Sequence, residues 1–328
     1  MNLPVLSDLE PLHSTHRLAQ VLAMGHNDLR AVAAHVGGFY EPFDRRKIRG
    51  EGKWRHIDNP NKNLKDIQTR IQCMLLRRFR FPETMLGGIR RRSITDNAHF
   101  HVNQPVVATI DLRDCFPRTS NKAVFAAFRR ELHCSTAVAS LLTQLTTLHR
   151  HVPQGAPTSL SVVNLTLLPL HDVILAITRS LGLRASLWVD DITVSGEQAQ
   201  EAIGPIIGAV TDHGHAVRCK KIFVYTAAHS QRVTGVVVNR KKSAGHLRVQ
   251  EIRSRIIDLA NQRLIVENDL ISVRGQITQV KSICQSQGES LERLAERILP
   301  ASGMMARRAR RDETRPCPNP SRHTYMNP

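Results

Sequence analysis

The hydrophobic pattern divides the chain into a mixed segment of strands and helices and a helical C-terminal third. Short apolar runs with strand character end at Asp111, flank the stretch "WVDDITVSG" at 188–196, and recur around 215–225 and 231–238. Apolar positions at helical spacing predict helices over residues 1–40, 64–79, 121–149, 159–177 and 197–213, and over most of 247–298. The pattern therefore predicts an α+β core with an appended helical bundle.

A basic segment near the N-terminus, "DRRKIRGEGKWRHIDNPNK" at 44–62, predicts a β-hairpin. Gly50 and Gly52 are placed to turn the chain between Ile48 and Trp54. A long uncharged stretch at 152–170 invites the question of a membrane span, but Pro153, Gly155 and the polar residues within it argue for a folded segment instead.

Charge changes this picture, because the chain of 328 residues carries 46 Lys and Arg against 28 Asp and Glu, a net charge of +18. Such a surplus indicates a polyanionic partner, with nucleic acid as the first candidate. An anionic membrane surface is the rival, although no long basic amphipathic helix supports it. The scattered cysteines, without a Cys-x-x-Cys pair, argue against a zinc site, and the N-terminus predicts no signal peptide, so we expect a cytoplasmic protein.

Two adjacent carboxylates, Asp190 and Asp191, interrupt the apolar run at 187–194, where a tight turn fits. They predict either an ordinary polar turn or a hairpin tip that presents charge to a metal ion. Asp111 ends another strand, so the three carboxylates converge if these strands are neighbours. Clustered carboxylates repel one another unless cations intervene, which favours two Mg²⁺ ions about 4 Å apart. Asp114 is expected only to cap the following turn.

Three stretches in order, "TIDLRDCFP", "VPQGAPTS" and "WVDDITVSG", resemble the palm motifs of reverse transcriptases, specifically the compact bacterial retron type. Three further stretches narrow the resemblance. They are the fingers opening "GEGKWRHIDNPNKNLKDIQTRI", the Asn-Ala-x-x-His pattern at Asn97, Ala98 and His101, and the Val-Thr-Gly signature at Val233, Thr234 and Gly235. The resemblance spans roughly residues 45–240. Trp188, Leu160 and Cys115 depart from the family pattern, but none touches the carboxylates.

The resemblance implies a right-hand polymerase with basic fingers, a palm built on an antiparallel sheet, and a small helical thumb. We accordingly expect an N-terminal helical extension at 1–44, fingers and palm at 45–240, a thumb at 241–305 and a basic tail at 306–328. It implies that Asp111, Asp190 and Asp191 are both the catalytic residues and the metal ligands.

The resemblance also selects residues for the nucleotide. Phe116 is expected beneath the sugar, where a 2′-hydroxyl would clash, and Gln154 and Gly155 are expected to shape the pocket. Arg55, with Lys47 and Lys53 as alternatives, is expected to meet the triphosphate, since a guanidinium also stacks on a base. Lys220 either protonates the leaving pyrophosphate or pairs with phosphate.

RNA-binding residues are expected in three places, at Asn97 and His101, at Val233–Gly235, and in the basic triplet Arg240, Lys241 and Lys242. Structural hydrogen bonding by His101 and an ordinary strand turn at 233–235 remain open alternatives. The tail "ARRARRDETRP" either binds phosphates or is a solvated segment.

The activity implied is RNA-directed DNA polymerisation from dNTPs with Mg²⁺. The implied partner is a dedicated structured non-coding RNA, which serves as template and primer and is partly copied into an RNA–DNA hybrid. A role in bacterial anti-phage defence with a separate effector protein is also implied, and no membrane partner is expected. The alternatives are another bacterial reverse transcriptase, either defence-associated or of the intron type, and a catalytically idle RNA-binding scaffold.

Overall fold

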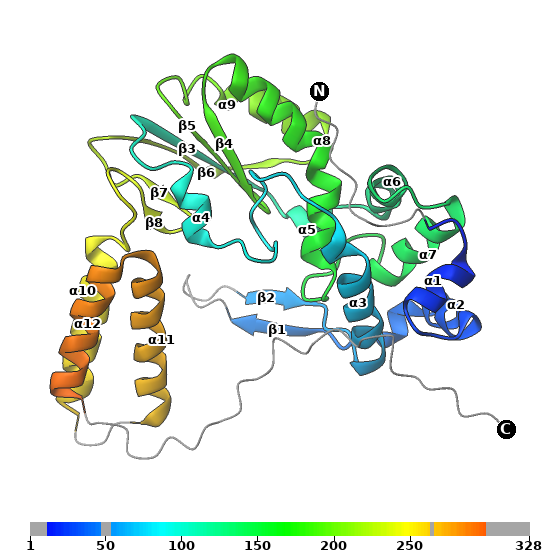
Figure 1. Ribbon diagram of the computed structural model, residues 1–328, viewed down its shortest axis with the longest axis horizontal. Helices are drawn as coiled ribbons and strands as arrows, with labels where there is room; N and C mark the ends of the chain where they lie inside the picture. Colours follow the sequence, from blue (N-terminus) through cyan, green and yellow to red (C-terminus); the bar gives the residue numbers. More distant parts are fainter. Residues whose placement is uncertain (1–11, 47–53, 263–265, 300–328) are drawn as a thin grey trace.

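The computed structural model describes residues 12–46, 54–262 and 266–299 (Figure 1). Three predicted features lie outside the described residues: the alternatives Lys47 and Lys53, the expected turn except for Trp54, and the tail at 306–328. The elements are α1 (Thr15–Val21), α2 (His26–Ala34), η1 (Val36–Phe39), β1 (Phe43–Arg46), β2 (Trp54–Ile57), α3 (Lys62–Met74), η2 (Leu76–Arg78), α4 (Ile94–His99), β3 (Val106–Leu112), α5 (Cys115–Arg118), α6 (Asn121–Glu131), α7 (Thr136–Thr146), α8 (Ser159–Ser180), β4 (Arg184–Trp188), β5 (Asp191–Ser195), α9 (Ile203–Asp212), β6 (Val217–Thr226), β7 (Arg232–Val233), β8 (Val236–Val237), α10 (His246–Ala260), α11 (Glu267–Ile283) and α12 (Gln285–Ile298).

The centre of the molecule is a four-stranded antiparallel sheet in the order β4-β5-β3-β6. Alternation along these strands gives the sheet one apolar face, with Ile110 and Ile192 paired on it, which packs against α8 and α9. The other face carries Asp111 paired with Asp191, and Thr109 paired with Thr193. The expectation that the strands bearing the carboxylates are neighbours is confirmed.

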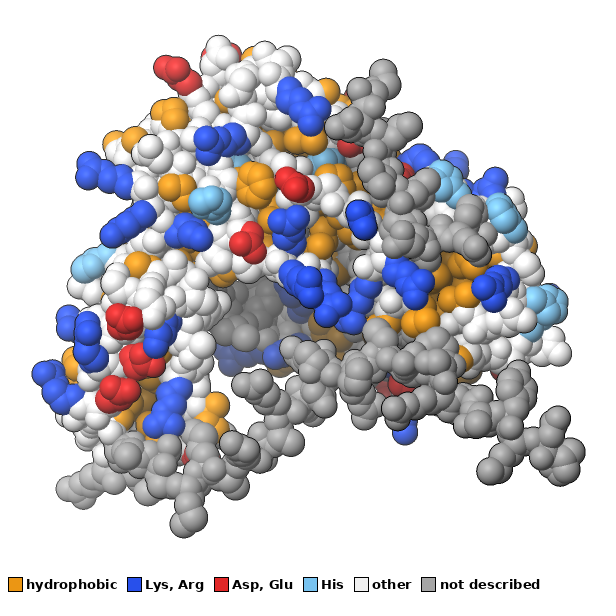
Figure 2. All heavy atoms as spheres, in the orientation of Figure 1, with side chains coloured by type: hydrophobic (Ala, Val, Ile, Leu, Met, Phe, Trp, Pro, Cys, Tyr) orange, Lys and Arg blue, Asp and Glu red, His pale blue; other side chains and the backbone are white. Residues whose placement is uncertain are grey.

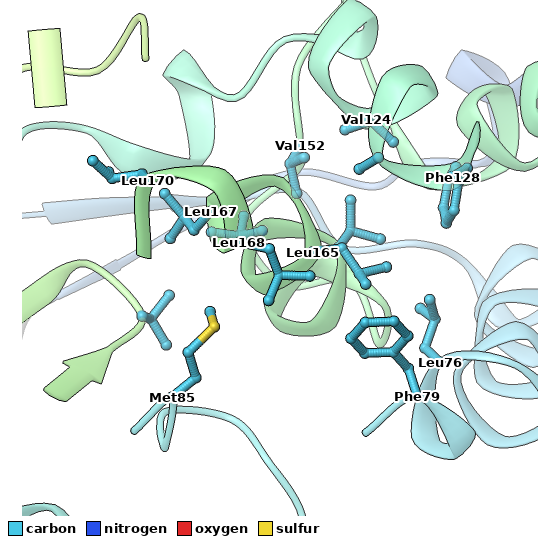
Figure 3. Packing of buried hydrophobic residues seen from close by; sticks show 14 of the residues in the cluster. Leu76, Phe79, Met85, Val124, Phe128, Val152, Leu165, Leu167, Leu168 and Leu170 are labelled. Carbon is cyan, nitrogen blue, oxygen red and sulfur yellow. The ribbon is translucent and has the colours of Figure 1, made fainter. Parts of the chain in front are cut away.

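Most helices pack into one hydrophobic core on the apolar side of the sheet, which includes Phe128, Leu165 and Met85 (Figure 3). The single helix expected over 121–149 is two helices, because the chain turns at His133 with a φ of 50° and Ser135 then caps α7. The N-terminal helices α1 and α2 pack on α7 in this same core. The boundary expected at residue 44 therefore does not separate two cores.

The helix α8 is long and apolar enough to cross a membrane by length and composition alone, and it is the only such helix found among the described residues. Its side chains Leu165, Leu167 and Leu170 are buried at the centre of the core (Figure 3). The protein itself therefore covers much of the apolar surface of this helix, with Leu160 and Val173 left exposed.

A second core lies under the three C-terminal helices, α10, α11 and α12, which form a bundle beside the sheet (Figure 1). Val233, Val236 and Val238 of the β7–β8 hairpin and Ala98 of α4 belong to this core. This bundle, from His246 to Ile298, lies within the range 241–305 where the sequence analysis expects a helical thumb, and its core includes residues of α4 and the hairpin.

Candidate active site

A cavity of about 740 Å³ lies between the β1–β2 hairpin and the polar face of the sheet. Six of its lining residues were predicted from sequence, namely Arg55, Asp111, Phe116, Gln154, Gly155 and Asp190. The lining also includes residues that sequence reasoning did not select, among them Trp54, His56, Ser159, Arg218 and Lys221. Segments separated by up to about half of the chain therefore meet at one place.

The turn that joins β4 to β5 positions the adjacent aspartates. Trp188 pairs with Asp191, so Val189 and Asp190 form the turn and Asp191 is the first residue of β5. Val189 has a φ of 56°, which is costly for a β-branched residue. Gly87 makes the close approach that holds this turn, because a Cβ there would lie 2.6 Å from the Val189 backbone nitrogen. The Leu112 N–H donates to the Asp190 carbonyl over 2.7 Å and joins the turn to β3.

Burial and mutual repulsion perturb the two adjacent carboxyls. Burial raises the pKa of Asp191 to about 7, and the charges of Asp190 and Asp111 add to the effect. Burial also raises the pKa of Asp190, and Asp111 contributes in the same direction, while Lys221 and Arg55 oppose it. The three carboxylates thus act on one another electrostatically, as the sequence prediction required.

Two cations hold Asp111. The Lys221 Nζ donates to its Oδ2 over 2.7 Å, and the Arg218 Nε lies 3.2 Å from its Oδ1. The Arg218 Nη2 also donates to Asp114 Oδ1 over 3.0 Å. Asp114 stands at the start of α5 but makes no side-chain cap, so the expectation that it caps the turn is wrong and its carboxylate pairs with Arg218 instead.

The lysine that lies at the cavity is Lys221, whereas the sequence analysis expected Lys220 to act on the pyrophosphate. Both residues lie inside β6 rather than after it, and neighbouring side chains in a strand point to opposite faces. Lys221 shares the face of Asp111 and lines the cavity, whereas Lys220 is not among the lining residues of the described chain. The pairing of Ile110 with Ile222 fixes this assignment, and because that register is set by the tertiary structure, no local signal in the sequence could have separated the two lysines.

The donor set fits a divalent cation, although no group of three His, Cys, Asp or Glu among the described residues is arranged around a common metal position. Lys221 and Arg218 pair with Asp111, but its buried Oδ1 accepts no hydrogen bond and is open to a cation. Carboxylate oxygens are the ligands that Mg²⁺ takes, and the mutual repulsion that raises the pKa of Asp191 is relieved by bound positive charge. We therefore regard Asp111, Asp190 and Asp191 as fitting metal ligands.

The floor of the cavity joins the hairpin to the palm through Gln154 and Gly155. The Gln154 backbone N–H donates to Asp58 Oδ2 over 2.9 Å, and the Asp58 N–H donates to the Gln154 carbonyl over 2.8 Å. Gly155 has a φ of 122°, and a Cβ there would lie 2.7 Å from Ile57 Cγ2. Glycine at 155 therefore permits the fingers to dock. Phe116 is half-buried, packing on the main core while it lines the cavity.

Asn97 and His101 are fully buried, with 0% exposure each. The imidazole of His101 contacts Ser195 Oγ at 2.7 Å and Ser186 Oγ at 2.8 Å, and the Ser186 hydroxyl donates to Asn97 Oδ1 over 2.7 Å. Burial lowers the pKa of His101 to about 3, so the ring is neutral. The prediction that these two side chains contact RNA is wrong, because both are buried and hydrogen-bond to serines of the sheet, and these bonds hold α4 against it.

The β7–β8 hairpin presents only part of the predicted Val-Thr-Gly site. Val233 is buried, whereas Thr234 is half-buried and Gly235 is exposed. Thr234 and Gly235 both have positive φ, 46° and 82°, as in a type I′ turn. The Asn97 Nδ2 lies 3.5 Å from Thr234 Oγ1, which ties this turn to α4. Direct RNA contact can therefore come from Thr234 and Gly235 but not from Val233.

The reverse transcriptase (RNA-dependent DNA polymerase) family matches residues 45–253, which is more than half of the chain. The chain belongs to this family. The predicted α+β reverse transcriptase fold and the predicted enzyme class, an RNA-directed DNA polymerase, are therefore confirmed.

Several curated relatives are retron enzymes. The retron Ec86 reverse transcriptase of Escherichia coli is 24% identical over 287 residues, which cover 86% of this chain and 87% of that protein. The retron Mx65 reverse transcriptase of Myxococcus xanthus is 28% identical over 262 residues, covering 74% and 61%. That of retron Se72 from Salmonella heidelberg is 28% identical over 188 residues, covering 57% and 49%. These relatives confirm the resemblance to retron-type reverse transcriptases.

Among solved structures, telomerase from Candida albicans in complex with a fragment of telomeric RNA overlaps this chain with a TM-score of 0.46. The overlap covers 79% of this chain and 58% of that one at 12% identity.

Proposed function

We propose that this reverse transcriptase copies part of a dedicated structured non-coding RNA into DNA, with Mg²⁺ held by Asp111, Asp190 and Asp191. The observation that carries the proposal is that Asp111 and Asp190 line one cavity large enough for a nucleotide, while Asp191, which is not among the lining residues, pairs with Asp111 on the neighbouring strand. Two Mg²⁺ ions would supply activation of the attacking primer hydroxyl and charge for the leaving phosphate.

The other lining residues have roles that follow from their positions. Arg55 on the fingers hairpin meets the triphosphate across the cavity from Asp190. Phe116 lies beneath the sugar and excludes a 2′-hydroxyl. Lys221, in place of Lys220, is the candidate to pair with or protonate the leaving pyrophosphate, because its ammonium lies at Asp111. Gln154 and Gly155 set the distance between the fingers and the palm.

A basic surface beside α4 is the proposed anchor for the RNA. The triplets Arg90–Arg92 and Arg240–Lys242 are about 150 residues apart in sequence, yet both act on Asp96. A hydrogen bond from Ser93 lowers the pKa of Asp96, and the charges of Lys242 and Arg92 lower it further. Figure 2 shows Lys and Arg side chains around the hollow between the thumb helices and the rest of the molecule. Phosphate neutralisation on such a surface gives strong, salt-dependent binding.

The biological setting is proposed from the retron relatives. It comprises template and primer supplied by one non-coding RNA, a DNA product attached to that RNA, and a separate effector protein acting in anti-phage defence in the bacterial cytoplasm. The RNA copurified with the protein from its native host should then be dominated by one short species, with DNA attached. Recovery of only heterogeneous cellular RNA would favour a general polymerase.

The catalytic proposal is tested by primer extension on an RNA template with Asp190→Asn. We expect the variant to bind RNA and fold like the wild type but to lose extension by at least about a hundredfold, because one ligand charge is removed. Asp212→Asn, an exposed carboxylate at the end of α9, is the matched control and should extend normally. Extension by Asp190→Asn near the wild-type rate would contradict the proposal, and failure of the wild type itself would favour an idle RNA-binding scaffold.

The RNA anchor is tested by reversing charge at Arg240, Lys241 and Lys242. Retention of the copurified RNA should weaken and its salt dependence should flatten by about three ion equivalents. Extension of a generic, pre-annealed primer–template should change little. Equal retention by the variant and the wild type would contradict the anchor without touching the catalytic proposal.

A further inference from the structure

Phe223, which is exposed, and Tyr225, which is half-buried, form an aromatic pair on β6, one of the two edge strands of the sheet. Their rings are stacked, with centroids 5.9 Å apart and an angle of 19° between the planes. Phe223 is 45% exposed, and neither ring is among the residues packed against the two cores of the described chain. An aromatic pair that is partly exposed and packs on neither core points to a ligand.

The pair lies on the catalytic face of the sheet. Phe223 is the strand partner of Thr109, and Thr109 is two residues before Asp111 on β3, so all three side chains share one face. Two residues along a strand cover about 7 Å, and stacked nucleotides rise about 3.4 Å each. The Phe223 ring is therefore about two nucleotides away from the position where the new bond forms.

Positive charge flanks the aromatic pair at both ends. Lys221 precedes Phe223 by two positions on the same face, with its ammonium at Asp111. Arg232 lies near Tyr225, where it opposes the increase in the pKa of the Tyr225 hydroxyl that burial causes. An aromatic surface between two cations matches a nucleotide strand, in which bases offer flat faces and phosphates offer negative charge.

We propose that Phe223 and Tyr225 form a stacking platform for an unpaired primer 3′ nucleotide that has left the reacting centre and lies about two nucleotides away from it. Tyr225 lies offset beside the Phe223 ring, and Phe223 remains 45% exposed, so its ring is accessible to a base. A base inside a continuous duplex has no free face, so the platform selects single-stranded or frayed nucleotides. The proposal rests on the proposed polymerase function, because it identifies the occupant from the position of the catalytic carboxylates.

The test compares two primer–template probes without dNTPs. One probe ends in an unpaired 2-aminopurine at the primer 3′ end, and the other is fully paired. The full-length wild type should quench 2-aminopurine on binding, whereas Phe223→Ala should lose the quenching and bind this probe about tenfold more weakly. The fully paired probe should bind both proteins equally. Phe223→Trp, which keeps an aromatic face, should restore binding.

Val224→Ala is the matched control, because Val224 is 37% exposed on the same strand but points to the opposite face. It should behave like the wild type with both probes. Phe223→Leu provides an apolar variant that keeps the strand folded but removes the aromatic face, and it should resemble Phe223→Ala.

Unchanged quenching and affinity in Phe223→Ala would overturn the platform. An equal loss of affinity for both probes would also overturn it. So would a substitution that changes only self-association in sedimentation, because this face would then be a protein interface. Extension of the paired primer–template is measured on the same preparations. Intact extension with unchanged probe binding rejects the platform alone, whereas failure of the wild type to extend rejects the proposed function.

Discussion

Replacing Asp191 by Asn should make the metal-free protein more stable while it removes activity. Asp191 is mostly buried, and its carboxyl is held near the negative charges of Asp190 and Asp111. In the unfolded chain the same group is solvated and far from both. The ionised carboxylate is therefore less favourable in the folded protein than in the unfolded one, and a neutral amide of the same shape avoids this cost.

The magnitude follows from the pKa. Burial and the neighbouring aspartates raise the pKa of Asp191 from 3.8 to about 7. At 1.36 kcal/mol per pH unit this corresponds to at most about 4 kcal/mol above pH 7. Because the pKa is higher in the folded state, the favourable contribution of the protonated carboxyl is complete below about pH 4 and is lost as the pH rises to about 7. At pH 5 the cost of ionisation is about 2 kcal/mol.

The assay is urea unfolding in EDTA at pH 8 and at pH 5. The gain in unfolding free energy of Asp191→Asn over the wild type should approach about 4 kcal/mol at pH 8 and fall to about 2 kcal/mol at pH 5. Excess Mg²⁺ at pH 8 should stabilise the wild type more than the variant and narrow the gap. Asp212→Asn, at an exposed site, should change stability by less than about 0.5 kcal/mol at either pH.

The electrostatic reasoning would be refuted by an Asp191→Asn variant that is no more stable than the wild type at pH 8. A gain of equal size at both pH values would also refute it, because the stabilisation would then not come from the missing charge.

Three further predictions concern neighbouring residues. Phe116→Ala should relax discrimination against rNTPs about tenfold or more by removing a steric clash, as single-nucleotide addition kinetics would show, and an unchanged ratio would assign Phe116 to core packing alone. Arg218→Gln should strengthen Mn²⁺ binding without nucleotide about fivefold in calorimetry, because a partly exposed ion pair worth about 1 kcal/mol no longer competes for Asp111, and equal affinity would contradict that competition. His101→Ala should lower the unfolding free energy by about 2–3 kcal/mol, since Ser186 and Ser195 lose a buried partner, and a loss of RNA binding without loss of stability would restore the direct role rejected above.

The sequence by itself determined the candidate catalytic carboxylates and many of the residues that line the cavity with them. Strand-forming runs ending at Asp111 and interrupted at Asp190 are local patterns, and the order of motifs supplied the rest of the palm, including Phe116 and Gly155. Such patterns can be recognised from the sequence because side-chain alternation and turn formation depend on only a few neighbouring residues. The helical C-terminal third was recognisable for the same reason.

Tertiary structure alone decided which polar groups face the cavity and which are buried and hydrogen-bonded inside the protein. His101 and Asn97 belong to a family motif, yet their partners Ser186 and Ser195 lie about 90 residues away in sequence, and burial leaves these two side chains no surface for RNA. Lys221 replaced Lys220 because strand register fixes which of two adjacent lysines shares the face of Asp111. Burial and register depend on segments far apart in the chain, so no local pattern in the sequence records them.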